Sequence, residues 1–333
     1  MKAVISVVIP SYNEEKYIGD CLNSLLKSDY ISELLEIIIV DGMSEDSTRK
    51  IVEDYEKKFS NIILINNPAR ITPVALNIGI LHAHGDYIMI ASAHAAFSRN
   101  YIRVLLEKLH EFDATGVGGR LITKTKVENK TAKAVVKILS NPSGVGNSKF
   151  RTGAGKPILV DTVPFGIYKK DVFSLYGLYN EKLVRNHDIE WSKRIINSGG
   201  RIYLIPEVFS LYYARENLHD FANNNYCNGY WNIITLYVTR KFGSLSIRHY
   251  IPFIFLSSQI LILLFSILFN KLLLIGLAVI IGAYLLYISY NSIILKDRDT
   301  GFFNLVSVFL VLHYSYGFGS IVGMFNISKL IKK

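Results

Sequence analysis

Apolar and polar residues follow two alternating patterns in the first third of the chain. Short runs rich in valine and isoleucine, typical of buried strands, alternate with longer stretches in which apolar residues recur at helical spacing. We place strands at 4–9, 36–40, 62–65 and 87–91, and helices at about 15–28, 45–59, 72–83 and 99–111. Strands that alternate with helices form βαβ units. The pattern therefore predicts an α/β fold with a mostly parallel, Rossmann-like sheet and helices on both faces.

Three long apolar runs follow residue 250. They cover 251–269, 272–294 and 302–325, and each is close to or above the roughly 20 residues that span a bilayer as a helix. Buried core helices are the alternative, but three nearly uncharged runs of this length favour transmembrane helices. The opening apolar run is too short for a signal peptide, so we expect these C-terminal segments to drive membrane insertion.

Basic residues are distributed unevenly around these runs. Arg240, Lys241 and Arg248 precede the first run, and Lys296 and Arg298 separate the second from the third. Cytoplasmic loops carry the excess of lysine and arginine, so we expect a multi-pass protein of the cell membrane with a cytoplasmic N-terminal domain. Three full spans would leave the lysines after residue 328 outside, against this rule. The third run, which contains a histidine, two tyrosines and three glycines, therefore either crosses, re-enters or packs against protein.

The segment before the first apolar run, residues 217–248, is amphipathic and aromatic, with a basic end. Aromatic belts mark membrane interfaces, so we expect a helix that lies in the interface. A helix packed on the N-terminal domain is the alternative. The predicted organisation is a cytoplasmic domain at 1–216, an interfacial helix at 217–248 and a transmembrane region at 249–333.

Composition limits the classes of function. The formal net charge is +10, 50% of the residues are hydrophobic and the mean hydropathy is +0.27. The basic residues are scattered and form no nucleic-acid-binding motif, so we expect no nucleic acid partner and assign the surplus to an anionic leaflet or to diphosphate ligands. Cys21 and Cys227 have no metal-ligand spacing and support no disulfide framework, which is typical of a reducing compartment.

Polar turns with carboxylates follow the first two predicted strands. Pro10 ends the first strand and the turn 11–15 follows it, while the second strand ends at Asp41 before another acidic turn. Ligands bind at the carboxyl ends of the strands in open α/β sheets. These turns therefore predict a ligand site in an enzyme that handles a nucleotide-like ligand. The alternative for Asp41 is a turn or helix-cap aspartate.

Several sequence blocks, taken in order, resemble one enzyme family. They are VVIPSYNEEKYIGDCLNSLL, EIIIVDGMSEDST, RITPVALNIGI, NPSGVGNSKFR, VDTVPFG and RNHDIEW. Together they resemble an inverting family 2 glycosyltransferase of the GT-A fold, and more narrowly the succinoglycan-type glycosyltransferases of exopolysaccharide assembly. The resemblance covers nearly all of residues 4–240. It implies transfer of a sugar from a nucleoside diphosphate donor to a lipid-linked acceptor at the membrane.

The resemblance also implies which residues bind the donor. Asp41 would accept from the base or ribose, and Arg70, which precedes the helix at 72–83, would clamp the diphosphate. Asn77 would face the nucleotide from that helix. For Arg70 and Asn77 the alternative is a solvated surface side chain. The full set of expected nucleotide-sugar-binding residues is Pro10, Tyr12, Asn13, Glu14, Asp41, Arg70, Asn77 and Ser92.

The end of the fourth strand departs from the family pattern. Family 2 enzymes usually carry Asp-x-Asp there, which holds Mg²⁺ or Mn²⁺ on the diphosphate, whereas this chain has Ser92-Ala93-His94. A hydroxyl and an imidazole form a weaker site for a hard cation than two carboxylates. Three arrangements stay open: an Mn²⁺ site through His94, a site completed by other groups, or no metal, with cationic side chains neutralising the diphosphate. A zinc cluster with His82 and His84 is rejected because no cysteine lies nearby.

Inversion in a single displacement needs a general base for the acceptor hydroxyl. Asp188, in the block RNHDIEW at the start of a predicted helix, matches the family's base position. The alternative role for Asp188 is a helix cap. Glu190 or His187 would support Asp188 or replace it, and Trp191 would offer a ring face to the acceptor sugar.

The acceptor side is expected around the VDTVPFG block. Asp161 is a second candidate carboxylate there, and Arg215 is expected to contact a lipid-linked diphosphate. Residues 124–157, rich in lysine, glycine and serine, predict a mobile loop over the site.

Two other functions are compatible with the same fold. A polyprenyl- or dolichol-phosphate sugar transferase would use lipid phosphate itself as the acceptor. A non-catalytic membrane protein would keep the fold without metal-dependent activity, as Ser92 hints, but Asp41, Arg70 and Asp188 argue against it. A processive polysaccharide synthase is disfavoured because no Gln-x-x-Arg-Trp stretch appears.

Overall fold

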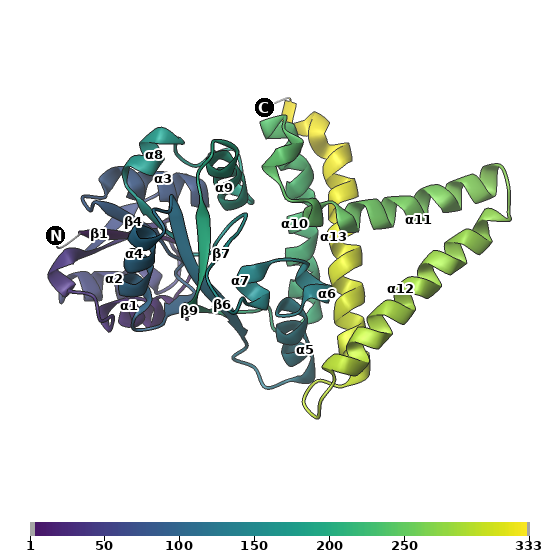
Figure 1. Cartoon of the computed structure of the whole chain (residues 1–333), viewed down its shortest axis with the longest axis horizontal. Coiled ribbons are helices and arrows are strands. Elements are labelled where there is room, and N and C mark those ends of the chain that lie inside the picture. Colours follow the sequence, from purple (N-terminus) through teal and green to yellow (C-terminus); the bar gives the residue numbers. More distant parts are fainter. Residues whose placement is uncertain (1–3, 332–333) are drawn as a thin grey trace. The chain divides into compact units, whose positions relative to one another are not determined.

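A computed structural model describes residues 4–331, and the chain falls into two compact units (Figure 1). The sheet unit runs up to Ile122 and resumes from Lys149 to Tyr213. The helical unit takes residues 123–148 and continues from Ala214. The boundary expected after residue 216 therefore lies close to a junction between the units, while residues 123–148 group with the C-terminal helices.

The sheet unit is built on one mixed sheet of nine strands. Its strand order is β3-β2-β1-β4-β8-β6-β9-β5, and β7 pairs with β9. The first four strands pair in parallel, as predicted, whereas β5, β7 and β8 form antiparallel pairs. The strands are β1 Ile5–Ser11, β2 Leu35–Asp41, β3 Ile62–Asn66, β4 Tyr87–Ile90, β5 Ala95–Phe97, β6 Gly116–Lys124, β7 Ile158–Leu159, β8 Ile167–Lys169 and β9 Ile202–Tyr213.

Helices cover both faces of this sheet. Alternate residues of β1 point to opposite faces, so Ile5 and Val7 pack with α1, α2 and α4, while Val8 packs with α3. The predicted helices form, with Pro73 in the first turn of α3, although the N-cap is Ile71 rather than Thr72. The helices are α1 Ile18–Leu26, η1 Ser32–Leu34, α2 Thr48–Glu56, α3 Thr72–His82, α4 Tyr101–Glu111, α7 Lys149–Thr152, α8 Asp171–Leu175 and α9 His187–Asn197.

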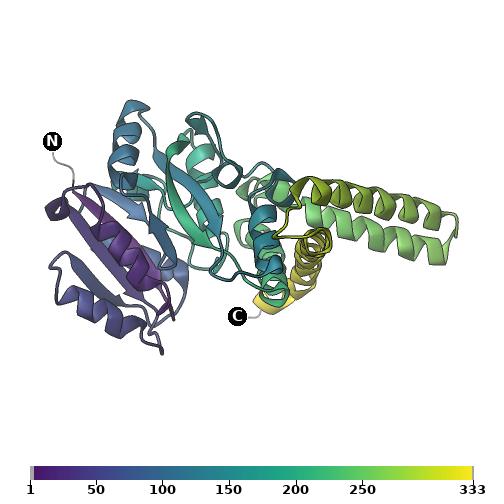
Figure 2. The same cartoon turned by 90° about the horizontal axis from the view of Figure 1, so that it is seen from below.

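The helical unit contains three helices that are long and apolar enough to cross a membrane, and they coincide with the three predicted runs (Figure 2). They are α11 Ile251–Leu268, α12 Leu273–Leu295 and α13 Phe302–Ile331. The helix expected at 217–248 is α10 Leu218–Thr239, which packs along α13. It is followed by the short turns η2 Phe242–Ser244 and η3 Ile247–His249.

The prediction of a mobile loop at 124–157 is wrong. This segment contains the helices α5 Lys130–Leu139, α6 Pro142–Val145 and α7. Asn129 caps α5 by accepting from the Ala132 N–H at 2.7 Å. The apolar residues of α5 face inward, with Val135 and Ile138 fully buried. Lysines between these positions made an amphipathic helix look like a polar loop.

Candidate functional site

The carboxyl ends of β1, β2 and β3 meet at one edge of the sheet. Ser11 is in register with Asp41, and Asp41 with Asn66. One step earlier, Pro10 is in register with Val40. Parallel pairing aligns the three strand ends, so the polar turns that follow them emerge side by side. This edge is the candidate site that the sequence predicts.

Asp41 is fully buried at this edge, and protein groups occupy both of its oxygens. Oδ1 accepts from Ser44 Oγ at 2.6 Å, and Oδ2 accepts from the Ser44 N–H and from Arg49 Nη1, each at 2.9 Å. The carboxylate therefore holds the turn after β2 in shape, which matches the alternative role for Asp41. Direct contact with a base or ribose stays a prediction. Arg49 is a partner that the sequence analysis missed, although it lies in the first turn of α2, just after the acidic turn.

Asn13 and Glu14 join the turn after β1 to the turn after β2. Asn13 has a left-handed backbone, with φ 54°, which asparagine tolerates because its side chain bonds locally. Its N–H donates to Ser44 Oγ at 2.8 Å, and its Oδ1 accepts from the Glu45 N–H at 2.8 Å. The Glu14 N–H donates to Thr48 Oγ1 at 2.7 Å. The two turns thus form one braced structure, and the Glu14 carboxylate stays available for other contacts.

Tyr12 and Arg70 form an exposed pair on these turns. The Arg70 guanidinium lies 5.5 Å from the Tyr12 ring centroid, and its Nη1 donates to the Tyr12 hydroxyl at 3.4 Å. The same guanidinium pairs with Glu45 at 2.9 Å. Gly42 packs against the ring, because a Cβ added there would lie 3.2 Å from Tyr12 Cδ2. An exposed ring beside a guanidinium is suited to stacking a flat ligand.

Asn77 has a different role from the expected one. It is buried in α3, where its Nδ2 donates to the Tyr179 carbonyl at 3.0 Å and to Glu181 Oε1 at 2.9 Å. Its Oδ1 accepts from the Tyr179 N–H at 2.9 Å. Because the amide is used inside the protein, it anchors the segment before α9 to α3 and does not face a nucleotide.

A second group of polar side chains lies at the end of β4. His94 Nδ1 lies 2.9 Å from Glu14 Oε1 and 3.3 Å from Ser92 Oγ. The His94 and Glu14 side chains are 37% and 21% exposed. Glu14 thus reaches from the turn after β1 to the end of the adjacent strand β4. It adds a carboxylate at the place where the family pattern has Asp-x-Asp.

The Ser92, His94 and Glu14 side chains are the candidate metal donors. The described part of the chain holds no cluster of three or more histidine, cysteine, aspartate or glutamate side chains that could bind a metal unaided. One carboxylate and one imidazole suit Mn²⁺ when phosphate oxygens complete its coordination, as is usual for cations bound together with phosphate ligands. The donor set therefore fits a cation shared with a diphosphate. In the rejected zinc set, His84 is instead paired with Glu36 at 2.8 Å.

Tyr212 and Arg151 complete the group at the end of β4, and the sequence analysis did not single them out. Tyr212 is in register with Ala95 across the β5–β9 pair, and its ring meets the His94 ring edge-on at 5.9 Å between centroids. The Arg151 guanidinium lies 5.0 Å from the centroid of the Tyr212 ring. Arg151 lies in the block NPSGVGNSKFR, which was a usable signal, whereas nothing in the sequence marks Tyr212.

Asp188 lies exposed in the first turn of α9. The preceding Asn186, with φ 61°, turns the chain into the helix. Among the described residues, the Asp188 carboxylate takes part in no hydrogen bond or ion pair. Burial, and after it the charge of Asp188, raises the pKa of Tyr168 well above its ordinary value, so the carboxylate is near this ring. An exposed carboxylate on a firmly anchored helix is suited to accept a proton.

The two neighbours that were considered as alternative bases are less available. Glu190 is buried and forms an ion pair with Arg194 Nε at 2.9 Å. Arg194 also donates to the Tyr176 carbonyl at 2.6 Å, so this pair fixes the loop before α9. Burial lowers the pKa of His187, which keeps its imidazole neutral near pH 7. Glu190 therefore has a structural role, and His187 is only partly exposed.

Trp191 does not offer a face to an acceptor sugar, and that expectation is wrong. It is 1% exposed and stacks on Phe173 at 4.7 Å between ring centroids. Its indole N–H donates to the Gly177 carbonyl at 2.7 Å. Trp191 and Ile195 are four residues apart on the buried stripe of α9, so the tryptophan belongs to the core.

The other two expected acceptor residues lie in different units. Asp161 is partly exposed in the sheet unit, and the adjacent Thr162 hydroxyl lies 3.1 Å from Ser192 Oγ, which ties this segment to α9. Arg215 is exposed and belongs to the helical unit. Their contact with an acceptor stays a prediction.

Comparison with known proteins supports the same assignment. Residues 6–176 match the family model of glycosyl transferase family 2. A dolichyl N-acetyl-α-D-glucosaminyl phosphate 3-β-D-2,3-diacetamido-2,3-dideoxy-β-D-glucuronosyltransferase from Methanococcus voltae is 31% identical over 324 residues, which is 94% of this chain and 95% of that protein. The succinoglycan biosynthesis protein ExoA of Rhizobium meliloti (strain 1021) is 28% identical over 215 residues, 64% of each protein.

A solved structure shares the fold over almost the whole chain. The mannosyltransferase PcManGT from Pyrobaculum calidifontis, in complex with GDP-Man and Mn²⁺, is 15% identical and has a TM-score of 0.63. The similarity covers 98% of this chain and 88% of that one. The predicted GT-A fold is confirmed. The chain is a glycosyltransferase and belongs to glycosyl transferase family 2.

Proposed function

We propose that this chain transfers a sugar, with inversion, from a nucleoside diphosphate sugar to a saccharide carried on a membrane lipid. The observation that carries the proposal is the match over 94% of the chain to the M. voltae enzyme, whose name describes transfer to a dolichyl-phosphate-linked sugar. The three apolar helices are consistent with an acceptor held in the cell membrane. The basic residues beside them favour a cytoplasmic sheet unit.

The nucleoside half of the donor would bind at the braced turns after β1 and β2. Tyr12 offers a ring face to the base, and Arg70 flanks that ring. Asp41 acts mainly by holding the turn. A carboxylate can accept about four hydrogen bonds. The Asp41 carboxylate accepts two from Ser44 and one from Arg49, so it can accept one more from a base or ribose.

The diphosphate half would lie beside His94, at the end of β4. Glu14 and His94 would hold a divalent cation together with the diphosphate oxygens, and the cation would neutralise the charge of the leaving group. Arg151, stacked on Tyr212 next to His94, supplies a second positive charge. A guanidinium can form two parallel hydrogen bonds to phosphate oxygens, so it can bind the diphosphate as it leaves.

The transfer step is a single in-line displacement. An acceptor hydroxyl oxygen bonds to the anomeric carbon, while the bond from that carbon to the diphosphate oxygen breaks. The electron pair of the broken bond leaves with the nucleoside diphosphate. Asp188 takes the hydroxyl proton and later releases it to water, because its carboxylate is exposed and free of protein partners among the described residues.

A donor and acceptor screen on the purified full-length chain tests this proposal. Nucleotide sugars are offered with polyprenyl phosphate or with polyprenyl-phosphate-linked saccharides, first in EDTA and then with Mn²⁺. We expect transfer only to the saccharide-bearing lipids, with an inverted anomeric configuration. Efficient transfer to polyprenyl phosphate itself would instead establish the lipid phosphate as the acceptor.

A further inference from the structure

The three apolar helices of the helical unit differ in their surroundings. The apolar windows of α11 and α12 are 11% and 6% buried within the protein, but that of α13 is 39% buried. In Figures 1 and 2, α11 and α12 form a hairpin that projects away from α13, whereas α10 lies along α13. The hairpin thus exposes much more of its apolar surface than α13 does, as helices that face lipid do.

Helix α10 and helix α13 are packed too closely to lie at different depths. Glycines make the backbones touch: a Cβ at Gly319 would clash with the Tyr226 backbone, and one at Gly323 would lie 2.8 Å from the Tyr230 carbonyl oxygen. Ser320 Oγ also donates to the Gly229 carbonyl at 3.1 Å. The Tyr226–Gly319 and Tyr230–Gly323 contacts advance along both helices in the same direction, so α10 and α13 run parallel.

Helix α10 is too polar to lie within a bilayer. It is 22 residues long, yet it is not among the helices apolar enough to span a membrane. It carries Asp220 in its first turn and five asparagines, at positions 223, 224, 225, 228 and 232. The Tyr226–Gly319 and Gly229–Tyr316 contacts join residues 93 and 87 positions apart, so Asp220 falls at about the level of residues 307–313 of α13. These residues lie inside the apolar window of α13, so a spanning α13 would carry an aspartate into the apolar part of the bilayer.

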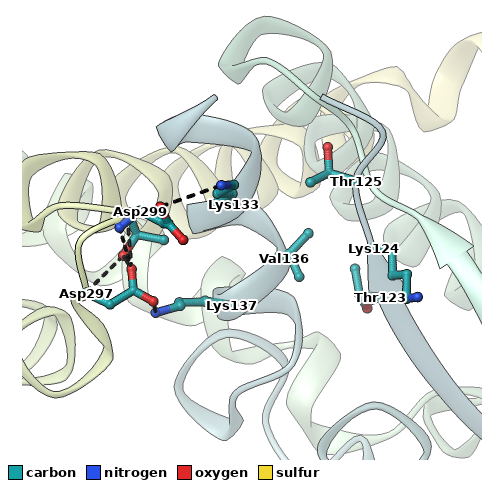
Figure 3. Close-up of a pocket in the computed structure, with 9 residues that line it drawn as sticks. Thr123, Lys124, Thr125, Lys133, Val136, Lys137, Asp297 and Asp299 are labelled. Atoms are coloured by element: carbon teal, nitrogen blue, oxygen red, sulfur yellow. Dashed lines mark hydrogen bonds and ion pairs between the residues drawn. The ribbon is translucent and has the colours of Figure 1, made fainter. Parts of the chain in front are cut away.

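The first turns of α13 are bound to α5, which is rich in lysine. Lys137 pairs with Asp297 and donates to the Leu295 carbonyl at 2.8 Å, and Lys133 lies 3.7 Å from Asp299. Figure 3 shows these pairs beside a pocket of about 290 Å³ at the loop between α12 and α13. These half-buried ion pairs between α5 and the charged loop therefore fix the start of α13 at the membrane surface.

The exposed face of α13 is mostly apolar from Phe303 to Phe325. Phe303, Phe318 and Phe325 are exposed, and at 100° per residue they fall within about 60° of one another around the helix. Leu305 and Leu312 are buried on the opposite side. The rest of α13 packs on α10, on α5 and on the α11–α12 hairpin, where Gly317 lies against Pro252 and Leu256. One apolar stripe left exposed on such a helix is typical of an element that lies in the membrane interface.

We propose that α13 lies with α10 in the headgroup region of the bilayer and does not cross it. Only the α11–α12 hairpin then spans the membrane, and the C-terminus stays on the same side as α5 and α10. The segment after α10 fits the same surface, because the exposed Phe242 and Ile247 lie next to Arg240, Lys241 and Arg248. Two crossings also put the C-terminal lysines on the basic, cytoplasmic side.

Labelling from each side of sealed vesicles tests the number of crossings. Cys227→Ser removes the partly exposed thiol, while Cys21 can stay because burial raises its pKa well above the ordinary value and hides it. Single cysteines are then placed by Asn270→Cys between α11 and α12, by Arg298→Cys between α12 and α13, and on a short tag after the last residue. Each is treated with a membrane-impermeant maleimide.

We expect the Arg298→Cys and tag cysteines to react from one face and the Asn270→Cys cysteine only from the other. Lys57→Cys, at an exposed lysine of the sheet unit, reports the side on which that unit lies and should react with the first two. A tag that reacts from the same face as Asn270→Cys would show three crossings and overturn the proposal.

A depth measurement gives an independent result. Nitroxide labels on cysteines at Phe303, Phe318 and Phe325 are compared with a label at Leu286, an exposed residue in the middle of α12. We expect the three α13 labels to have similar, shallow depths and the Leu286 label to be the deepest. A label at Phe318 that is as deep as the one at Leu286, and deeper than those at Phe303 and Phe325, would overturn the proposal.

Discussion

Replacing Asp188 by asparagine separates catalysis from folding. The substitution keeps the size of the side chain and removes only its charge. Because the carboxylate is exposed and has no hydrogen-bond or ion-pair partner among the described residues, the fold loses only its interaction with the α9 N-terminus. That interaction is worth about 0.3–1 kcal/mol. We therefore expect a variant that is folded, binds the donor and transfers sugar slowly.

The expected loss of rate follows from the role of the base. A positioned general base contributes about 10²–10⁴-fold to a reaction, or about 3–5 kcal/mol of the barrier. Water can reach the acceptor hydroxyl at an exposed position and replace the base in part. We therefore expect kcat to fall by about 10²–10³-fold, toward the lower part of that range.

Glu190→Gln is the matched control, because it neutralises a carboxylate two residues away on the same helix. Glu190 is buried and paired with Arg194, so its loss leaves a cation short of a partner. The cost is about 1–3 kcal/mol of unfolding free energy. For a unit of this size that shifts Tm by about 2–4 °C per kcal/mol. We expect kcat per folded molecule to change little.

Three measurements on the full-length variants in the same detergent distinguish these outcomes. They are the rate of transfer with both substrates saturating, the Kd of the donor by calorimetry, and Tm. We expect Asp188→Asn to lower mainly the rate and Glu190→Gln to lower mainly Tm. The reasoning is refuted if Asp188→Asn turns over at the wild-type rate, or if Glu190→Gln causes the larger loss of kcat.

Three further predictions concern the donor site and the core. His94→Ala removes the partner of Glu14, so the Mn²⁺ concentration needed for half-maximal donor binding should rise by about 10–100-fold in calorimetry, and an unchanged value would exclude a metal role. Arg151→Met should raise KM for the donor by about 10–100-fold while Tm stays near wild type, and Arg151→Lys should recover part of the loss; equal KM values would place Arg151 outside the site. Gly79→Ala should lower the free energy of unfolding by about 1–3 kcal/mol in denaturant, because the new methyl group would clash with Val8 where α3 packs on β1. An unchanged denaturation midpoint would show that α3 and β1 can move apart enough to accommodate the methyl group.

The parts of the fold that depend on local pattern could be predicted from the sequence. β1 and β2 are continuous apolar runs because parallel strands are buried on both faces, and such runs are recognised without knowledge of their neighbours. The C-terminal helices follow equally from length and composition. Segments of mixed composition are harder to assign from sequence. The helix α5 was predicted to be a loop because three lysines alternate with its buried apolar residues.

The roles of individual side chains depended on contacts that a linear pattern does not contain. Trp191 and Glu190 lie in the same sequence block as Asp188. Trp191 and Glu190 are buried whereas Asp188 is exposed, because successive residues of a helix are turned by about 100°. Asn77 has an amide that could serve a ligand, but the segment at 179–181 uses it. Proximity in sequence therefore did not distinguish catalytic from structural residues.

The sequence by itself determined that the chain has four parallel strands with a ligand edge, the motifs of family 2 in order, and three apolar helices. Each of these features depends on the pattern of residues within short segments of the chain. Only the tertiary structure decided that Glu14 meets His94, since β1 and β4 are adjacent in the sheet although two other strands separate them in the chain. It also brought Arg151 to Tyr212 and α10 to α13. These contacts join distant segments, and strand order and helix packing, rather than local propensity, decide which segments meet.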